Sequence, residues 1–364
     1  MVRIGLDWVR AAILAMLFIA IAMLAQLQIA SANTSAQDRQ SFKLAWSVYV
    51  SFVPWDYAQE AGIIDKWADR FGIEIEVVQF NSYLESLRQF REGKYQAVTA
   101  SNIDLMMMDA ALGHDTTAVI VNSVSDGADM VILRDGKELA DIEGRTISLV
   151  EGSVSDYLLA RAVEMAGLSP DDVTIKNVQD YQLVSDYLLH EAQGVVTWNP
   201  HGFDVLEQPD ATPVFTSAEI PGEIIDITAV GTDVLNAHPE FGKALAGAWY
   251  ETMALMAAEN REGIKARREM AEAIGTDLLG FEAQLVTTKM FYEPEEAAGF
   301  VHDPELLSTM DHLRTLIFDR GLMGAATKPV VPIITPAGAV PGDAGTPALR
   351  FEAEYMDYAA KEMM

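Results

Sequence analysis

The sequence contains no cysteine and has few basic residues. Its 364 residues include 25 Lys and Arg against 54 Asp and Glu, which gives a formal net charge of −29. Without cysteine the chain can form no disulfide, no thiolate metal site and no lipid anchor that is attached through a cysteine. A field this negative repels nucleic acid and anionic lipid. We therefore expect no nucleic-acid partner.

A long uncharged apolar run occurs at the N-terminus. Arg3 and Arg10 flank its start, residues 11–25 carry no charge, and Ala30-Ser31-Ala32 has the small-x-small pattern of a cleavage site. This arrangement predicts a signal peptide over residues 1–32, cleaved after Ala32, and a soluble, monomeric protein in the periplasm. The apolar run is shorter than the roughly 18 residues of a spanning helix. An uncleaved anchor is the alternative.

Strand-like and helix-like segments alternate in the first part of the mature chain. Apolar, β-branched patterns predict strands at residues 42–48, 73–79, 97–99 and 117–122, and capping signals precede helices between them. The order βαβαβα implies parallel strands with right-handed crossovers. A polar strip at residues 123–129 then leads directly into another strand, at 130–133, which predicts a crossing into a second lobe.

The second lobe is centred on residues 144–159, GRTISLVEGSVSDYLL, where a strand stops at a helix start. Such a junction leaves backbone N–H groups free to hold a small polar ligand. A strand at residues 224–230 is interpreted as the return crossing. We predict an α/β, two-lobed fold with a hinge: residues 42–125 plus 231–320 form lobe 1, residues 130–226 form lobe 2, and 325–364 form a Pro/Gly-rich tail.

Several short segments in this order resemble the periplasmic substrate-binding proteins of ABC importers, in the group for nitrate, sulfonates, taurine and thiamine precursors. They are EGKYQA at 92–97, DIEGRTI at 141–147, AGLSPDDV at 166–173 and TWNP at 197–200. The resemblance covers residues 42–320, and it implies a type II-like periplasmic-binding-protein fold. It implies two lobes that close over a small ligand, delivery to a permease in the inner membrane, no catalysis and no cofactor.

Within that group, the chain resembles binding proteins associated with urea carboxylase, which implies urea or guanidine as cargo. Nitrate, taurine or another alkanesulfonate, and a thiamine precursor are the alternatives. A pyrimidine synthase of thiamine biosynthesis shares the fold and is the enzyme alternative. That family relies on a cysteine-rich motif, and this sequence has no cysteine.

The chemistry of the predicted binding loops favours a planar cation. Ligands of open α/β sheets lie beyond the carboxyl ends of the strands, and the seven loops at those ends contain no Lys or Arg. Carboxylates accept the in-plane N–H groups of guanidinium, and an aromatic face stacks on its plane. The candidate ligand-binding residues are Trp46, Tyr49, Trp55, Asn102, Asp126, Glu151, Ser153, Trp198 and Asp226.

Several of these candidates have a structural alternative. Trp46 lies on a strand and can belong to the core, Ser153 can cap a helix, and Asp126 can be a turn residue. Asp226 stands between two isoleucines, and an acid inside an apolar run requires a partner. The six histidines show no metal-ligand spacing, so no metal site is predicted.

Overall fold

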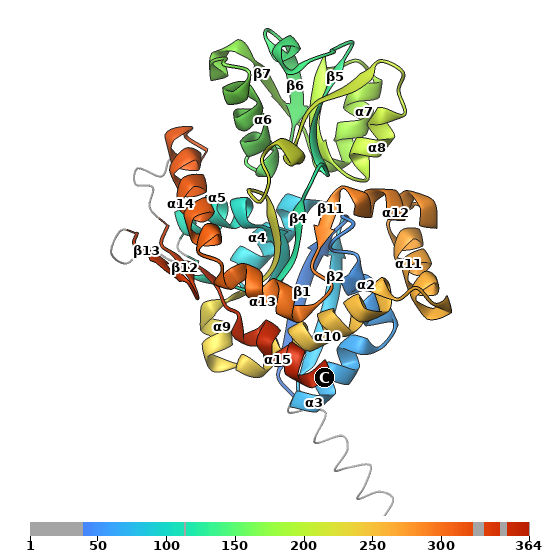
Figure 1. The fold of residues 1–364 in the computed structure, drawn as a ribbon, viewed down its shortest axis with the longest axis vertical. Coiled ribbons are helices and arrows are strands. Elements are labelled where there is room, and N and C mark those ends of the chain that lie inside the picture. Colours follow the sequence, from blue (N-terminus) through green and yellow to red (C-terminus); the bar gives the residue numbers. More distant parts are fainter. Residues whose placement is uncertain (1–38, 113, 323–330, 343–347, 364) are drawn as a thin grey trace, which may run out of the picture.

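The computed structural model describes residues 39–112, 114–322, 331–342 and 348–363, and the predicted signal peptide lies outside them. These residues form two lobes, each built around its own sheet (Figure 1). The predicted α/β two-lobed architecture is thus present. Among the described residues, no helix has the length and apolar character needed to cross a membrane.

The first lobe contains a nine-stranded mixed sheet with the order β13-β12-β14-β4-β10-β3-β1-β2, and β11 pairs with β4. β1 runs parallel to β2 and β3, whereas β10 is antiparallel to both β3 and β4. The strands are β1 (Ser41–Ser47), β2 (Glu74–Phe80), β3 (Ala97–Ser101), β4 (Thr116–Ser125), β10 (Ile225–Gly231), β11 (Thr288–Met290), β12 (Ile333–Thr335), β13 (Gly338–Val340) and β14 (Leu349–Phe351).

The position of β10 corrects one predicted boundary. The sequence interpretation assigned residues up to 226 to the second lobe, but all of β10 lies in the first sheet. Its backbone fills the gap between β3 and β4, which would otherwise leave two buried strand edges without hydrogen bonds. As a result, Asp226 enters the site from the first lobe.

Helices cover both faces of the first sheet. α3 buries Ile63, Ile64 and Trp67, and it packs on α10, where an added Cβ at Gly247 would lie 2.3 Å from the Trp67 ring. The helices are α2 (Pro54–Glu60), α3 (Ile63–Phe71), α4 (Tyr83–Arg91), α5 (Asn102–Leu112), α9 (Thr232–Ala237), α10 (Pro239–Ala257), α11 (Arg261–Ala273), α12 (Leu278–Val286), α13 (Pro294–His302) and α14 (Pro304–Asp319).

The C-terminal segment is part of the first lobe rather than a tail along its described ranges. β14 continues the sheet parallel to β4, and α15 (Glu354–Met363) packs on α10 and α13. An added Cβ at Gly242 of α10 would lie 2.4 Å from Tyr355, so the glycine allows this close contact. The predicted tail over 325–364 is therefore wrong for residues 331–342 and 348–363. Composition concealed the two short apolar strands that enclose its proline-rich part.

The second lobe is a five-stranded sheet with the order β7-β6-β8-β5-β9, with α6 on one side and α7 and α8 on the other (Figure 1). Its strands are β5 (Asp129–Arg134), β6 (Thr146–Leu149), β7 (Thr174–Asn177), β8 (Gly194–Trp198) and β9 (Ala211–Thr216). Its α-helices are α6 (Val154–Met165), α7 (Leu183–Leu188) and α8 (His201–Leu206), and single 3-10 turns occupy Leu139–Ile142, Pro170–Asp172, Asp180–Gln182 and Ser217–Glu219.

Two segments connect the lobes, residues 126–128 after β4 and residues 217–224 before β10. They are tied together: the hydroxyl oxygens of Ser125 and Ser217 are 2.7 Å apart, and the N–H of Gly127 donates to Ser217 Oγ at 2.8 Å. Gly127 has a φ of 104°, which favours glycine. Both crossings therefore leave the first lobe at one place, as a hinge requires.

Candidate functional site

A small cavity lies where the two lobes meet. The volume within which the centre of a water molecule can move is about 30 Å³. With the lobes in this position, the cavity therefore admits a ligand of only a few non-hydrogen atoms. The lining residues come from both lobes and from the second crossing. They are Ser47, Tyr49, Phe52, Tyr83, Ser101, Asp129, Val154, Trp198, Ile224 and Asp226.

The ends of strands and the start of helices bring these residues together. Ser101 ends β3 and Trp198 ends β8, while Val154 is the first residue of α6. Asp129 begins β5, and Asp226 lies near the start of β10. Ligands of open α/β sheets lie beyond the carboxyl ends of strands, and the antiparallel directions of β10 beside β3 and of β5 beside β8 bring the starts of β10 and β5 to the same edges.

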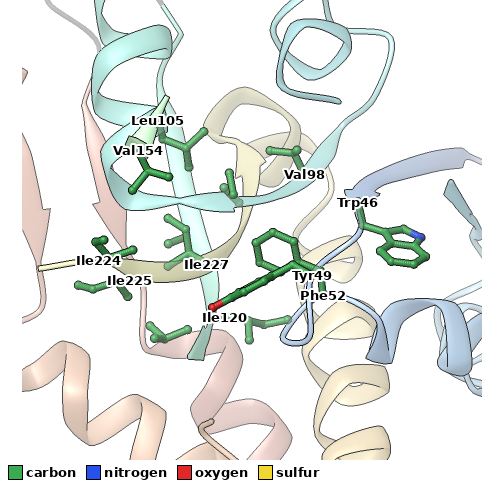
Figure 2. Close-up of a cluster of buried hydrophobic side chains, with 14 of the residues drawn as sticks. Trp46, Tyr49, Phe52, Val98, Leu105, Ile120, Val154, Ile224, Ile225 and Ile227 are labelled. Atoms are coloured by element: carbon green, nitrogen blue, oxygen red, sulfur yellow. The ribbon is translucent and has the colours of Figure 1, made fainter. Parts of the chain in front are cut away.

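Aromatic rings form much of the wall. Tyr49 and Phe52 meet edge to face with ring centroids 5.2 Å apart. Figure 2 shows them in one apolar cluster with Ile224, which precedes β10, and Ile227, which lies within it. Tyr83 of the first lobe and Trp198 of the second are also in edge contact, at 6.2 Å. The cavity thus offers flat apolar faces from each lobe.

Asp226 is the most deeply placed acid of the cavity. Its Oδ2 accepts from Ser123 Oγ at 2.6 Å and from Ser51 Oγ at 3.3 Å. Burial raises the pKa of Asp226 to about 8, against the hydrogen bond from Ser123, and the nearby Asp129 adds to the rise. Two hydroxyl donors are therefore not sufficient to hold a full negative charge here.

Asp129 lies on the other side of the lobe boundary. Its Oδ2 accepts from Ser125 Oγ at 2.6 Å, and burial raises its pKa to about 6. Among the described residues, none donates to Oδ1 of Asp129 or of Asp226, although both side chains line the cavity. Each acid therefore has one oxygen available to a ligand.

A third acid, Asp104, lies directly behind the cavity wall. It is fully buried, and its Oδ2 accepts from the hydroxyls of Tyr83 and Ser101, while Oδ1 has no partner among the described residues. Burial raises the pKa of Asp104 to about 7, against these hydrogen bonds. We call Asp104, Asp129 and Asp226 the acid cluster.

In the described part of the chain, the side-chain donors to the acid cluster are all hydroxyl groups, and no Lys or Arg is among them. Among the described residues that line the cavity, none is Lys or Arg. Three buried acids without a positive partner either keep protons or take their charge balance from outside. The site is therefore organised for a cation, or for a ligand that meets protonated carboxyl groups.

The start of α6, which the sequence predicts as a binding loop, already has protein partners. Ser153 caps the helix by accepting from the N–H of Ser155 at 3.2 Å, and Asp156 accepts from the N–H of Gly152. The N–H of Val154 is close enough to Asp104 to lower the pKa of that carboxyl group. The N–H groups of Gly152 and Ser155 are thus engaged by a carboxylate and a hydroxyl, and an anionic ligand would compete with these acceptors.

Three of the nine predicted ligand-binding residues line the cavity, and six do not. Tyr49, Trp198 and Asp226 are brought together there. Trp46 is buried in the first lobe, and Trp55 packs on Trp249 with a centroid distance of 5.1 Å.

The other four predicted residues either hold the backbone in place or are exposed. Asn102 binds the second crossing, donating to the carbonyl of Glu223 and accepting from the N–H of Ile225, both at 3.0 Å. Ser153 is the helix cap of α6. Asp126 and Glu151 are exposed, and Asp126 borders a separate cavity behind the hinge. Side-chain direction at loop ends, which sequence pattern does not give, accounts for these corrections.

The predicted set omitted Asp104 and Asp129. Asp129 and Tyr83 lie in loops that the strand-end rule selects. They were left out of the candidate set because other residues of the same loops were chosen. Asp104 follows Ser101 with the S-x-x-D spacing of a helix start and has the appearance of a cap. Only the packing of α5 against the second lobe shows that it is buried. No group of three metal-binding side chains occurs in the described part of the chain.

Solved structures place this architecture in a known class. The periplasmic aliphatic sulphonate binding protein of Escherichia coli superposes with a TM-score of 0.64 at 15% identity, over 79% of this chain and 95% of that one. The periplasmic nitrate-binding protein of Synechocystis PCC 6803 superposes with a TM-score of 0.57 at 12% identity, over 90% and 99% of the two chains. The chain has the two-lobed periplasmic-binding-protein fold.

Sequence comparison gives the family. Residues 35–275 match the NMT1-like family, and the chain belongs to it. The taurine-binding periplasmic protein of Escherichia coli K12 is 24% identical over 205 residues, which are 52% of this chain and 59% of that protein. The alignment therefore spans less than two thirds of this curated relative.

Proposed function

We propose that this chain is the solute-binding component of an ABC importer and that it captures a small planar nitrogen compound, guanidinium first and urea second. It would then deliver this cargo to a permease in the inner membrane, without catalysis. One observation carries the proposal: Asp129 and Asp226 line the interlobe cavity, and no Lys or Arg lines it among the described residues.

Guanidinium satisfies the requirements of this cavity. It donates several N–H bonds in one plane, so one ion can bridge a free oxygen of Asp129 on the second lobe and one of Asp226 on the first. Trp198 and Tyr83 both line the cavity, so their aromatic rings are placed to contact the flat side of the ion. Cation and aromatic contacts of this kind contribute about 0.5–2 kcal/mol each.

Urea has the same plane but no charge. Burial raises the pKa of Asp226 to about 8, so at neutral pH this carboxyl group is able to carry a proton. A protonated acid donates to the urea oxygen, and an ionised acid accepts from its N–H groups. Urea therefore fits as a weaker second cargo.

A sulfonate, taurine or nitrate is the second candidate, because the relatives named above carry taurine, sulphonate and nitrate in their names. The ammonium group of taurine matches the acid cluster. Its sulfonate, like nitrate, needs donors, and the N–H groups of Gly152 and Ser155 at the start of α6 already donate to Asp156 and Ser153. The geometry therefore favours the cation.

Thermal unfolding of the purified protein with guanidinium, urea, taurine and nitrate tests the proposal. A ligand at about 100 times its dissociation constant adds roughly 2.7 kcal/mol to the free energy of unfolding. We expect a rise in melting temperature with guanidinium and a smaller rise with urea. Tetramethylammonium chloride, a cation without N–H donors, is the matched control. Stabilisation by taurine or nitrate, with no response to guanidinium, would contradict the proposal.

A further inference from the structure

Helix α4 is capped by a residue of the opposite lobe. Ser82 stands at the N-cap position in extended conformation, yet its side chain makes no capping hydrogen bond. The N–H of Tyr83, the first residue of α4, instead donates to Oδ2 of Asp180 at 2.6 Å. Tyr83 belongs to the first lobe and Asp180 to the second, so the bond exists only while the lobes are together.

Asp180 is held in place by its own lobe. The N–H of Val178 donates to Leu149 O at 3.0 Å, and Gln179 and Gln182 bind each other through a backbone bond of 2.8 Å and a side-chain bond of 3.1 Å. Oδ1 of Asp180 accepts from the N–H of Tyr181 at 2.9 Å. The turn thus fixes one carboxyl oxygen and leaves the other to α4.

The capped residue is also part of the cavity wall. The ring of Tyr83 lines the cavity, its hydroxyl donates to Asp104, and the hydroxyl oxygen accepts from the N–H of Ser101 at 3.0 Å. Three groups of one residue therefore connect the ligand space, the acid cluster and the opposite lobe. A change at Asp180 reaches the cavity through this residue.

We propose that Asp180 is a positioning residue, whose cap on α4 favours the closed arrangement of the lobes and holds the Tyr83 ring against the cavity. When the lobes separate, water replaces the bond at both groups, so its net contribution is made only in the closed state. This inference rests on the two-lobed fold and not on the identity of the cargo.

Two other bonds between the lobes lack this connection. Asn199 donates to Thr287 Oγ1 at 3.1 Å, and Arg320 meets Glu164 at 3.4 Å. Neither Thr287 nor Arg320 lines the cavity. Arg320 and Glu164 thus provide a matched interlobe contact with no cavity partner.

Energy transfer between two dyes tests the proposal on the ligand-free protein. Because the chain has no cysteine, single cysteines at the exposed positions Leu189 of the second lobe and Glu272 of the first carry the dyes without background labelling. Asp180→Ala should lower the ratio of closed to open molecules about fivefold, the usual effect of removing a cap. Ser82→Ala, at the cap position that makes no bond, should leave the ratio unchanged.

The same variants separate positioning from general stability. Asp180→Ala should speed dissociation of a bound ligand more than it slows association, whereas Arg320→Ala should change neither rate more than twofold. Asp180→Asn is the second variant, to be used if Asp180→Ala does not fold. It retains one carbonyl acceptor for the N–H groups of Tyr83 and Tyr181, so the ratio of closed to open molecules should fall less than in Asp180→Ala. An unchanged ratio in the folded Asp180 variants, or an equal shift in Ser82→Ala, would overturn the inference. Absence of guanidinium binding would overturn only the proposed cargo.

Discussion

Two acids of the first lobe, Asp115 and Asp226, have opposite surroundings. Asp115, at the far end of β4, accepts two bonds from Arg350, at 2.7 and 2.9 Å, and one from Thr232 at 2.7 Å. Partial burial opposes the change, but these bonds lower the pKa of Asp115. Asp226 receives only hydroxyl donors from the protein, and burial raises its pKa to about 8.

The difference separates an acid that is paired within the protein from one that the proposed function assigns to the ligand. Asp115 is neutralised by a cation of the same chain, which joins β14 to the start of β4. The acid cluster has no such cation among the described residues that line the cavity. Burying these acids is unfavourable unless a proton or a ligand balances their charge, and under the proposed function the guanidinium ion is that ligand.

The largest expected effect is on cargo affinity. Asp226→Asn should weaken guanidinium binding by about 1.5–3 kcal/mol, roughly tenfold to a hundredfold, because it removes a charge-assisted hydrogen bond. Asp129→Asn should have an effect of the same order, and urea should lose much less in both variants. Calorimetric titration measures these affinities.

Asp126→Asn is the matched control for this series. Asp126 is three residues from Asp129 but is exposed and borders the cavity behind the hinge. Its affinity for guanidinium should equal that of the wild type. If Asp226→Asn and Asp129→Asn also bind with unchanged affinity, the acid cluster is not the cargo site.

A change at Asp115 should affect stability and leave affinity alone. Asp115→Asn replaces a paired carboxylate, so we expect the free energy of unfolding to fall by about 1–2 kcal/mol above pH 5. The lowered pKa means that the wild type loses this contribution as the pH falls, so the two proteins should converge in acid. Thermal unfolding at pH 7 and at pH 3 measures the effect. A weaker affinity for guanidinium in this variant would contradict the assignment of Asp115 to stability alone.

The smallest expected effect concerns the aromatic wall. Trp198→Leu should weaken guanidinium binding by about 1 kcal/mol, roughly fivefold, because it removes a flat face, while Trp198→Phe should lose less. Trp55→Phe is the control, since Trp55 packs on Trp249 away from the cavity. Equal losses in the Trp55 and Trp198 variants would show that general destabilisation, and not stacking, lowers the affinity.

Much of the fold could be predicted from sequence periodicity, because each lobe alternates strands and helices. The exception at β10 arises because an apolar strand of seven residues fits either sheet, and only pairing with β3 and β4 decides. The three short strands of the C-terminal segment, β12, β13 and β14, have three residues each, too few for a periodic signal.

The site was less predictable, for a physical reason. The strand-end rule selected loops that contain Tyr49, Trp198 and Asp226, and these three residues line the interlobe cavity. Whether an acid becomes buried depends on what the opposite lobe places over it, and that holds for Asp104 and Asp129.

Proton release on guanidinium binding tests the central claim most directly. The acid cluster has pKa values raised to about 6, 7 and 8, so the folded, ligand-free protein holds protons that the unfolded chain releases at lower pH. Deprotonation therefore destabilises the empty protein as the pH rises through this range. A bound cation favours the ionised acids, so affinity should increase with pH, by up to about tenfold per unit for each proton released.

Calorimetry at pH 7 in two buffers with different ionisation enthalpies counts these protons. We predict release of on the order of one proton per guanidinium bound, and less from Asp226→Asn. Guanidinium binding without proton release, at an affinity independent of pH between 6 and 8, would contradict the account.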